Sequence, residues 1–473
     1  MKINTLDCDA QALREKILDL AMRGKLVPQD PDDEPASELL EKIKAEKKQL
    51  IKEKKIKKTK PLAPITDKEK PFDIPDSWEW VKFGDIVSFS LGKTPRRGNK
   101  KYWENGTIPW VSISDIKDKR LLNKTKEEIT NQALEDSFKN NLVPKGTLLM
   151  SFKLSIGKVC ILDVPAVHNE AIISIFPFIN KDYITRDYLY YLLPIISTMG
   201  EFTPAIKGKT LNKTLINELK IPLPPLSEQS RIAAKIAQLF ALLRKVESST
   251  QQYTKLQTLL KSKVLDLAMR GKLIEQDPHD EPASVLLEKI KVEKEQLIKE
   301  KKIKKSKPLP PITDKEKPFD IPDSWEWVRL GDIGEIFAGG DKPKNYSKHK
   351  NADNPFPIYS NGLKDKGLYG FTKTPRVKKD AITLSARGTV GHVEYRSIPF
   401  FPIIRLISFV PYNKEYLKCL FYFLQSEELI EKGDGSSIPQ LTVPRLKPKV
   451  IPFPPLSEQQ RITTKIINLF AFL

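Results

Sequence analysis

The chain contains one long segment twice. Residues 17–86 and 264–333 are almost identical and begin ILDLAMRGKL and VLDLAMRGKL, respectively. A second block, PLPPLSEQ from Pro222, recurs as PFPPLSEQ from Pro452. A duplicated block of this length is expected to fold the same way twice, so the sequence predicts a scaffold used in two copies.

Two inserts of unlike sequence lie between the repeated blocks. They cover residues 87–221 and 334–451, and the second is the shorter. Each insert opens with SWEWV and GDI, an alternation of aromatic and apolar residues that predicts a strand with Trp78 and Trp80 on its core face. A constant scaffold beside divergent inserts indicates that the two inserts recognise different targets.

The scaffold is expected to be helical. Apolar residues follow an alternating four-three spacing typical of a coiled coil, with polar breaks at Thr250 and Gln257: Ile232, Ile236, Leu239, Leu243, Val246, Tyr253, Leu260, Val264 and Leu267. This helix should end at Gly271, and a second helix should run from 281–284 to 305. We therefore predict an α+β fold in which long antiparallel coiled-coil helices separate two mixed α/β domains.

The repeat also predicts a circular arrangement. Leu473 corresponds to Leu243, so residues 457–473 and a first helix ending near Arg23 are expected to form one discontinuous copy of the central helix. The two ends of the chain would then meet, and the molecule would have approximate two-fold symmetry. The predicted regions are an N-terminal helical region, a first α/β domain, central helices, a second α/β domain and a C-terminal helix, at 1–60, 61–221, 222–307, 308–451 and 452–473.

Composition indicates an acidic partner. The chain has 80 Lys and Arg residues against 60 Asp and Glu residues, a formal net charge of +20. Such a field attracts polyanions, nucleic acid above all, although excess lysine also serves solubility alone. The three cysteines are widely spaced and no long apolar run is present, which favours a cytoplasmic protein without a disulfide framework or a membrane span.

Basic and polar loop residues are the candidate DNA contacts, since lysine and arginine bind phosphates and arginine also bonds guanine. In the first insert they are Lys93, Thr94, Arg96, Arg97, Lys100, Lys101, Lys153, Lys207 and Lys209. In the second insert they are Lys342, Lys344, Lys348, Asn361, Arg387, Ser436 and Gln440. We match Lys153 with Arg387, Gly157 with Gly391, and Thr210 with Gln440. Ordinary exposed loops are the alternative interpretation of these segments.

Catalytic motifs are missing from the sequence. The triplets at 92–94 and 208–210 read GKT but lack the upstream glycine of a phosphate-binding loop. The four histidines have no metal-ligand spacing. A nuclease-like cluster around Lys82 has Arg329 in its twin, and arginine cannot replace a lysine that gives up a proton. We therefore expect no cofactor, metal or catalytic residue in this chain.

The combination of LDLAMRGKLVPQDPDDEPAS, PLPPLSEQSRI and IPDSWEWVKFGDI resembles the specificity subunits of type I restriction-modification enzymes, over nearly the whole chain. The resemblance implies two target-recognition domains, each reading half of a split, asymmetric site in double-stranded DNA. It also implies two modification subunits that use S-adenosylmethionine to methylate adenine, and restriction subunits that use ATP and Mg²⁺.

The scaffold helices would set the distance between the half-sites. About 40 helical residues at 1.5 Å each span roughly 60 Å, which is less than two turns of B-DNA at about 34 to 36 Å per turn. We therefore expect half-site centres about one turn apart. Two alternatives remain at this point: a stand-alone DNA methyltransferase or nuclease, and a coiled-coil scaffold that binds no DNA.

Overall fold

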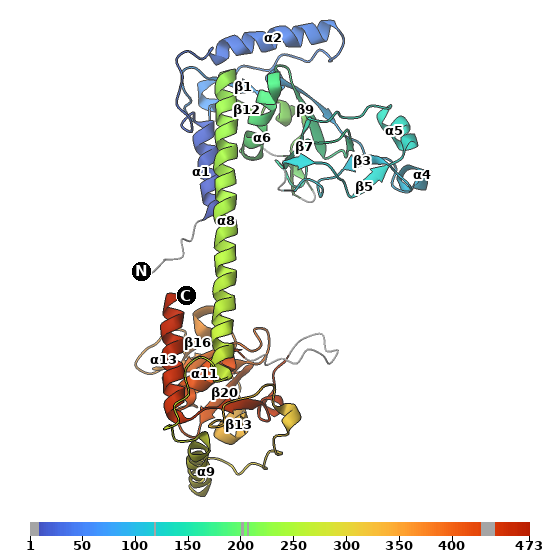
Figure 1. Ribbon diagram of the computed structural model, residues 1–473. Helices are drawn as coiled ribbons and strands as arrows, with labels where there is room; N and C mark the ends of the chain where they lie inside the picture. The colour runs from blue at the N-terminus through green and yellow to red at the C-terminus, as the bar shows by residue number, and fades with distance from the viewer. Residues whose placement is uncertain (1–8, 118–119, 200–202, 206–207, 427–439) are drawn as a thin grey trace. The chain divides into compact units, whose positions relative to one another are not determined.

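A computed structural model of the protein describes residues 9–117, 120–199, 203–205, 208–426 and 440–473. Within these ranges the chain forms two compact units: the first unit ends at Ser249 and the second unit begins at Thr250. Helix α8 (Leu226–Met269) contributes its N-terminal part to the first unit and its C-terminal part to the second. Each unit combines part of this helix with a mixed α/β insert (Figure 1).

In the first unit, α8 packs against helix α1 (Ala10–Met22), which runs beside it (Figure 1). Arg14 of α1 forms an ion pair of 2.6 Å with Glu247, while Met22 shares a buried core with Ile232. These contacts run in opposite directions along the two helices, so the pair is antiparallel. Helix α2 (Ala36–Lys52) follows and buries Leu39 and other apolar residues in the same core.

The second unit repeats this arrangement with a different piece of chain. Helix α13 (Leu456–Phe472) places Ile462 and Ile466 in one core with Leu265 and Met269 of α8. Helix α9 (Ala283–Lys299) is the counterpart of α2. Residues 264–269 thus serve the second unit as 17–22 serve the first, as the repeat predicts. The meeting of the chain ends, the two-fold symmetry and the five region boundaries stay predictions.

The predicted apolar stripe of α8 is covered only near its ends. Ile232 and Ile236 are fully buried, but Val246, Tyr253 and Leu260 are 46%, 42% and 49% exposed. Helices α1 and α13 are shorter than the stripe, and this leaves its middle open in the described structure. A coiled coil along the whole stripe therefore stays a prediction.

The helix after Gly271 is shorter than predicted. Gly271 itself has φ +66°, as expected for a residue that ends a helix, and a Cβ there would lie 2.4 Å from the Pro322 Cγ. Helix α9, however, ends at Lys299 and not at 305. The amides of Lys302 and Ile303 both donate to the Leu297 carbonyl, at 2.9 and 3.3 Å, and this turns the chain back.

The two proline-rich connectors, residues 58–76 and 305–323, are not extended along their whole length. Each contains one short 3-10 turn, η1 (Asp67–Glu69) or η3 (Asp314–Glu316). Thr66 and Glu69 cap the first of these turns reciprocally, which satisfies backbone groups at its start.

Each insert enters and leaves through one antiparallel ribbon. Strand β1 (Glu79–Lys82) pairs with β12 (Lys220–Leu223), and β13 (Glu326–Arg329) pairs with β21 (Val450–Phe453). Trp78 therefore precedes the strand, which begins two residues later than the SWEWV segment. The GDI segments, which are expected from sequence to continue the strands, fold instead as the short helices α3 (Phe83–Ile86) and α10 (Leu330–Ile333). Because the ends of each insert are neighbours in the ribbon, the same scaffold can carry inserts of different length and sequence.

The first insert contains two sheets, with strand orders β2-β9-β6-β7-β4 and β5-β3-β8. Its remaining elements, in chain order, are α3 (Phe83–Ile86), β2 (Val87–Leu91), α4 (Lys100–Trp103), β3 (Ile108–Val111), β4 (Leu121–Leu122), β5 (Glu127–Ile129), α5 (Asn131–Phe138), β6 (Leu148–Ser151), β7 (Val159–Leu162), β8 (Val167–His168), β9 (Ile172–Pro177), η2 (Lys181–Tyr183), α6 (Ile184–Ile196), β10 (Thr203–Ala205), β11 (Gly208–Thr210) and α7 (Lys213–Asn217).

The second insert has the strand orders β14-β20-β17-β18 and β16-β15-β19. Its elements are α10 (Leu330–Ile333), β14 (Gly334–Ala338), β15 (Phe356–Tyr359), η4 (Lys364–Gly367), β16 (Leu368–Thr372), β17 (Ala381–Ser385), β18 (Val393–Arg396), β19 (Phe401–Pro402), β20 (Leu406–Pro411), α11 (Leu417–Ser426) and α12 (Val443–Leu446).

Strand β6 shows why the central strands lack a polar face. Leu148 and Met150 join the core beneath α6 and the scaffold helices, while Leu149 joins a separate core on the other face. A strand buried on both faces is expected to be apolar throughout, as its sequence LLMS largely is.

A buried polar contact, which we call the Trp–Glu lock, joins the residue immediately before each ribbon to a scaffold helix. In the first unit the Trp78 indole donates to the Glu228 carboxylate at 2.8 Å, and the Gln29 amide donates to its other oxygen at 2.6 Å. In the second unit Trp325 and Gln276 donate to Glu458 at the same distances. The repeated PLSEQ motif therefore supplies the acceptor in both copies.

An ion pair lies beside each lock. Arg231 bonds Asp33 through both of its terminal nitrogens, at 3.1 and 2.5 Å, and Arg461 bonds Asp280 in the same way, at 3.0 and 2.6 Å. The hydrogen bonds from Arg231 lower the pKa of Asp33. These pairs fix the loop before α2 or α9 to the start of the following scaffold helix.

We predict that Glu228→Ala destabilises the protein. The substitution leaves the buried Trp78 indole without its acceptor, at a cost of about 1 to 3 kcal/mol. It also removes one of the two acceptors of the exposed Gln29 amide. The free energy of unfolding, measured with denaturant and tryptophan fluorescence, tests this, with Glu458→Ala as the matched variant. A change below about 0.5 kcal/mol, the usual scale of surface substitutions, would contradict the role of the lock.

The lock also predicts a pH dependence. Burial raises the pKa of Glu228 and of Glu458, so the folded state holds these protons more tightly than the unfolded state. Their contribution to stability is complete below the unfolded pKa and is lost as pH rises through the raised folded pKa. The stability of the wild type relative to a Glu228→Gln/Glu458→Gln variant should therefore increase as pH falls from about 7 to about 4.5. Denaturant titrations across this range measure it, and the opposite slope would contradict the assignment.

Candidate nucleic-acid interface

The basic loop of the first insert, residues 92–101, begins at a point of very close packing. A Cβ at Gly92 would lie 2.0 Å from the His168 carbonyl oxygen, so only glycine fits there. The Lys93 amide donates to that same carbonyl at 2.9 Å, and the Lys93 carbonyl accepts from the Trp110 indole at 3.0 Å. These contacts fix the start of the loop against strands β8 and β3.

Arg97 holds the middle of this loop. Its guanidinium lies 4.0 Å from the Trp103 ring centre and 4.7 Å from that of Trp110, and it forms a two-point ion pair with Glu127. The two tryptophans meet edge to face with their ring centres 5.2 Å apart. The charge of Arg97 is therefore already matched within the protein.

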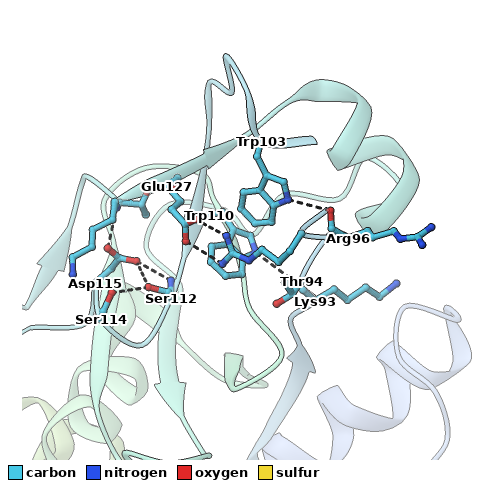
Figure 2. A network of polar contacts seen from close by, with 12 residues as sticks. Lys93, Thr94, Arg96, Trp103, Trp110, Ser112, Ser114, Asp115 and Glu127 are labelled. Carbon is cyan, nitrogen blue, oxygen red and sulfur yellow. Dashed lines mark hydrogen bonds and ion pairs between the residues drawn. The ribbon is translucent and has the colours of Figure 1, made fainter. Parts of the chain in front are cut away.

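The neighbouring Arg96 has a different environment. Its carbonyl accepts from the Trp103 indole at 3.3 Å, while its exposed side chain extends away from this cluster (Figure 2). Among the described residues, no acidic group pairs with this side chain. Arg96 is thus an available guanidinium on a loop that Arg97 keeps in place.

The other residues predicted in this loop are exposed, and their contacts differ. The Lys93 ammonium donates to the Ser137 carbonyl at 3.0 Å, and Lys100 pairs with Glu104 at 3.5 Å. Within the described chain, the Lys101 side chain has no such partner. The Thr94 hydroxyl donates to Glu170.

Glu170, which sequence analysis missed, links this loop to Lys153. Burial opposes its ionisation, but the Thr94 hydroxyl and the positive charges of Lys153 and Arg97 outweigh burial and lower its pKa. Lys153 lies in the turn between β6 and β7, which we call the first tip turn (residues 152–157). The structure thus brings the basic loop and the first tip turn to one region of the first unit.

Asp115 is a second residue that sequence analysis missed. Its buried carboxylate accepts from the Ser112 amide and hydroxyl, at 2.9 and 2.6 Å, and from the Lys126 amide at 2.9 Å (Figure 2). The SISD sequence after β3 carried the signal, since serine and aspartate favour such turns. Asp115 joins the turn after β3 to the segment before β5 and does not face solvent.

The second insert has the matching turn between β17 and β18, which we call the second tip turn (residues 386–391). The Asn361 side-chain amide donates to the Arg387 carbonyl at 2.6 Å, and the Thr389 hydroxyl donates to the Asn361 carbonyl at 2.6 Å. Arg387 also pairs through its backbone with Gln440. Three of the predicted residues of this insert therefore meet at one turn.

The predicted lysines at 342, 344 and 348 lie on a separate exposed loop. The Lys342 ammonium lies 5.0 and 6.0 Å from the ring centres of Tyr346 and Tyr369. No ion pair within the described residues involves Lys344 or Lys348. This loop joins the β16-β15-β19 sheet through backbone bonds between Ser347 and Phe371.

Arg396 of the second insert plays a supporting part like that of Arg97. It is buried, lies 3.7 Å from the Tyr359 ring centre, and donates to the Thr383 hydroxyl at 3.0 Å and the Lys366 carbonyl at 2.8 Å. Burial lowers the pKa of its guanidinium.

Two of the predicted residues, Lys207 and Ser436, lie outside the described residues. Lys209 is described as part of strand β11, next to Thr210, whose backbone pairs with that of Lys153.

The Cys160 thiol and the His168 imidazole, two side chains that could take part in a reaction, are buried. Burial raises the pKa of the Cys160 thiol to about 12 and lowers that of the His168 imidazole to about 4. In the ranges that the structure describes, no group of three or more His, Cys, Asp and Glu side chains is placed to hold a metal ion. No helix in the same ranges combines the length and apolarity needed to cross a membrane.

Comparisons with known proteins agree on one family. The type I restriction modification DNA specificity domain matches residues 75–255 and 322–472. The type I restriction enzyme EcoAI specificity subunit of Escherichia coli is 32% identical over 538 residues, which cover 97% of this chain and 88% of the relative. The EcoEI specificity subunit of the same species is 36% identical over 383 residues, which cover 70% of this chain and 63% of the relative.

A solved structure shares the fold. It comes from work on complex assembly and conformational transition of the type I R-M system, and it aligns with a TM-score of 0.55 at 18% identity, over 85% of this chain and 92% of that chain. The duplicated scaffold, the two α/β inserts and the sequence matches lead to one conclusion. The chain belongs to the type I restriction-modification DNA specificity family.

Proposed function

We propose that the chain recognises a split, asymmetric DNA site, with each insert reading one half, and that it performs no chemistry on the DNA. The observation that carries this proposal is the pair of inserts. Each is held by the same ribbon and the same Trp–Glu lock, yet each presents different basic side chains. A fixed mount with variable contact loops suits two readers of different sequence.

Within each insert we assign the basic residues to two roles, contact with DNA and positioning of the contact loop. Arg96 and Lys101 in the first insert, and Lys344 and Lys348 in the second, are exposed and available for DNA contacts. Arg97 positions the loop that carries Arg96, because its own charge is matched by Glu127. Base contacts specify the sequence, while phosphate contacts fix the register.

The chemistry would come from partner subunits. We propose that two modification subunits with S-adenosylmethionine, and restriction subunits with ATP and Mg²⁺, assemble with this chain in the cytoplasm. Exposed apolar side chains on α8 support a docking role for that helix, since Leu256 and Leu259 are 57% and 65% exposed.

The central test is binding. The chain, purified with its modification subunit, should bind duplex DNA with sequence preference and with affinity that falls steeply as salt increases. Tested alone with DNA, Mg²⁺ and S-adenosylmethionine, it should show no turnover. Sequence-independent binding, or any turnover by the chain alone, would contradict the proposal.

We predict that Arg96→Ala changes one half-site only. Loss of a guanidinium that contacts a base edge should weaken discrimination at that position by about 1 to 3 kcal/mol. Selection from a random duplex pool measures the preference at both half-sites. Lys344→Ala in the second insert is the matched variant and should leave the first half-site unchanged; an equal loss at both half-sites after Arg96→Ala would indicate a folding defect instead.

Exchange of the inserts gives a further prediction. Replacing residues 334–451 with a copy of 87–221 should give a chain that reads the same half-site twice, because both ribbons present the insert ends in the same way. The reciprocal exchange is the control. Mapping of methylated adenines tests it, and retention of the original asymmetric site would contradict the assignment of specificity to the inserts.

The spacing of the half-sites is a third prediction. We expect their centres about one turn of DNA apart, so that both inserts approach the same side of the duplex. Sequencing of methylated adenines in host DNA gives this distance, and half-sites on opposite faces would contradict it.

A further inference from the structure

The two tip turns have the same construction although the inserts differ in sequence. Each lies between two adjacent strands of its sheet, β6 and β7 or β17 and β18. Each places a basic residue at the same position, Lys153 or Arg387. Both turns have left-handed backbone at equivalent residues. The φ angles are 63° at Leu154 and 82° at Gly157 in the first turn, and 82° at Gly388 and 81° at Gly391 in the second turn.

Backbone hydrogen bonds close both turns in the same way. The Gly157 amide donates to the Ser151 carbonyl at 2.9 Å, and the Gly391 amide donates to the Ser385 carbonyl at 3.0 Å. In addition, the Leu211 amide donates to Phe152 and the Leu441 amide donates to Ala386, both at 2.9 Å. Each turn is therefore tied to the segment that leads back to the scaffold.

The basic side chains of these turns are available. Lys153 and Arg387 are half-buried. Neither has a carboxylate within ion-pair distance among the described residues. In the second turn, moreover, the amides of Gly388, Thr389 and Val390 donate to no acceptor in the described part of the chain. A positive side chain beside unpaired amides is an arrangement that binds anionic oxygen.

We propose that the two tip turns are equivalent DNA phosphate contacts, which set the register of each insert on the duplex and do not read bases. This inference rests on the proposed function. If the two half-sites differ in sequence, a device that both inserts share cannot distinguish them. The part of DNA that is the same at every site is the sugar–phosphate backbone.

The difference between the two turns supports this assignment. Lysine stands in one turn and arginine in the other. A phosphate accepts hydrogen bonds from either, whereas the geometry of base recognition depends on the side chain. The bonds that fix Lys153 to Thr210 and Arg387 to Gln440 also place these charges relative to the scaffold and not relative to the variable loops.

The test is the salt dependence of binding. The full-length chain, purified with its modification subunits, is titrated with a duplex selected from a random pool and with a scrambled duplex, between 50 and 200 mM salt. For Lys153→Ala and for Arg387→Ala we expect the slope of log affinity against log salt to fall by about 0.9 per lost phosphate contact. Both duplexes should lose affinity by the same factor, and the selected base preference should not change.

Conservative variants and a neutral control complete the design. Lys153→Arg and Arg387→Lys keep the charge and should restore the wild-type slope. Lys44→Ala, which removes a lysine of α2 paired with Glu41, should leave the slope unchanged. An unchanged slope in both alanine variants, or an altered base preference at either half-site, would overturn the inference. A wild-type complex that binds both duplexes equally would instead overturn the proposed function.

Discussion

The Trp–Glu lock is the interaction on which the arrangement of each unit depends. A buried carboxylate is costly unless its oxygens are hydrogen-bonded, and here an indole and an amide satisfy them. The three partners come from the loop after α1, the residue just before the ribbon and the start of α8. One acceptor therefore fixes the mount of the insert to the scaffold. Its repetition with Glu458 gives the second insert an equivalent mount.

Among the differences between the two scaffold copies, one replaces Lys82 by Arg329. Both side chains are buried, at 7% and 3% exposure. Arg329 donates to the carbonyls of Pro310, Pro311 and Pro448 and also bonds Glu316. These bonds tie the proline-rich connector to the ribbon. Arg329 therefore has a structural role in the second copy.

Some basic side chains of the inserts support the loops, and others are available for contact with DNA. Arg97 and Arg396 lie against aromatic rings and bond protein groups, whereas Arg96 and Arg387 leave their guanidinium groups available. A DNA-binding insert needs both supporting and contacting cations. The supporting cations keep the loop rigid, and a contact residue on a rigid loop loses less entropy on binding than one on a flexible loop. The Glu170 carboxylate serves the same end by accepting from the Thr94 hydroxyl of the basic loop.

Repeats and periodic apolar residues are local patterns, so the sequence alone was enough to predict the duplicated scaffold and the helix end at Gly271. Its motifs also indicated the family, and alignment of the inserts matched Lys153 with Arg387. The sequence did not determine which cations are free. Arg96 and Arg97 are adjacent and alike in sequence, and only the approach of Trp103, Trp110 and Glu127 separates their roles. It also placed the end of α9 too late, because the return of Ile303 onto Leu297 is a packing event. Tertiary structure decides such points because they depend on partners that are distant in the chain or on the way a helix end folds back.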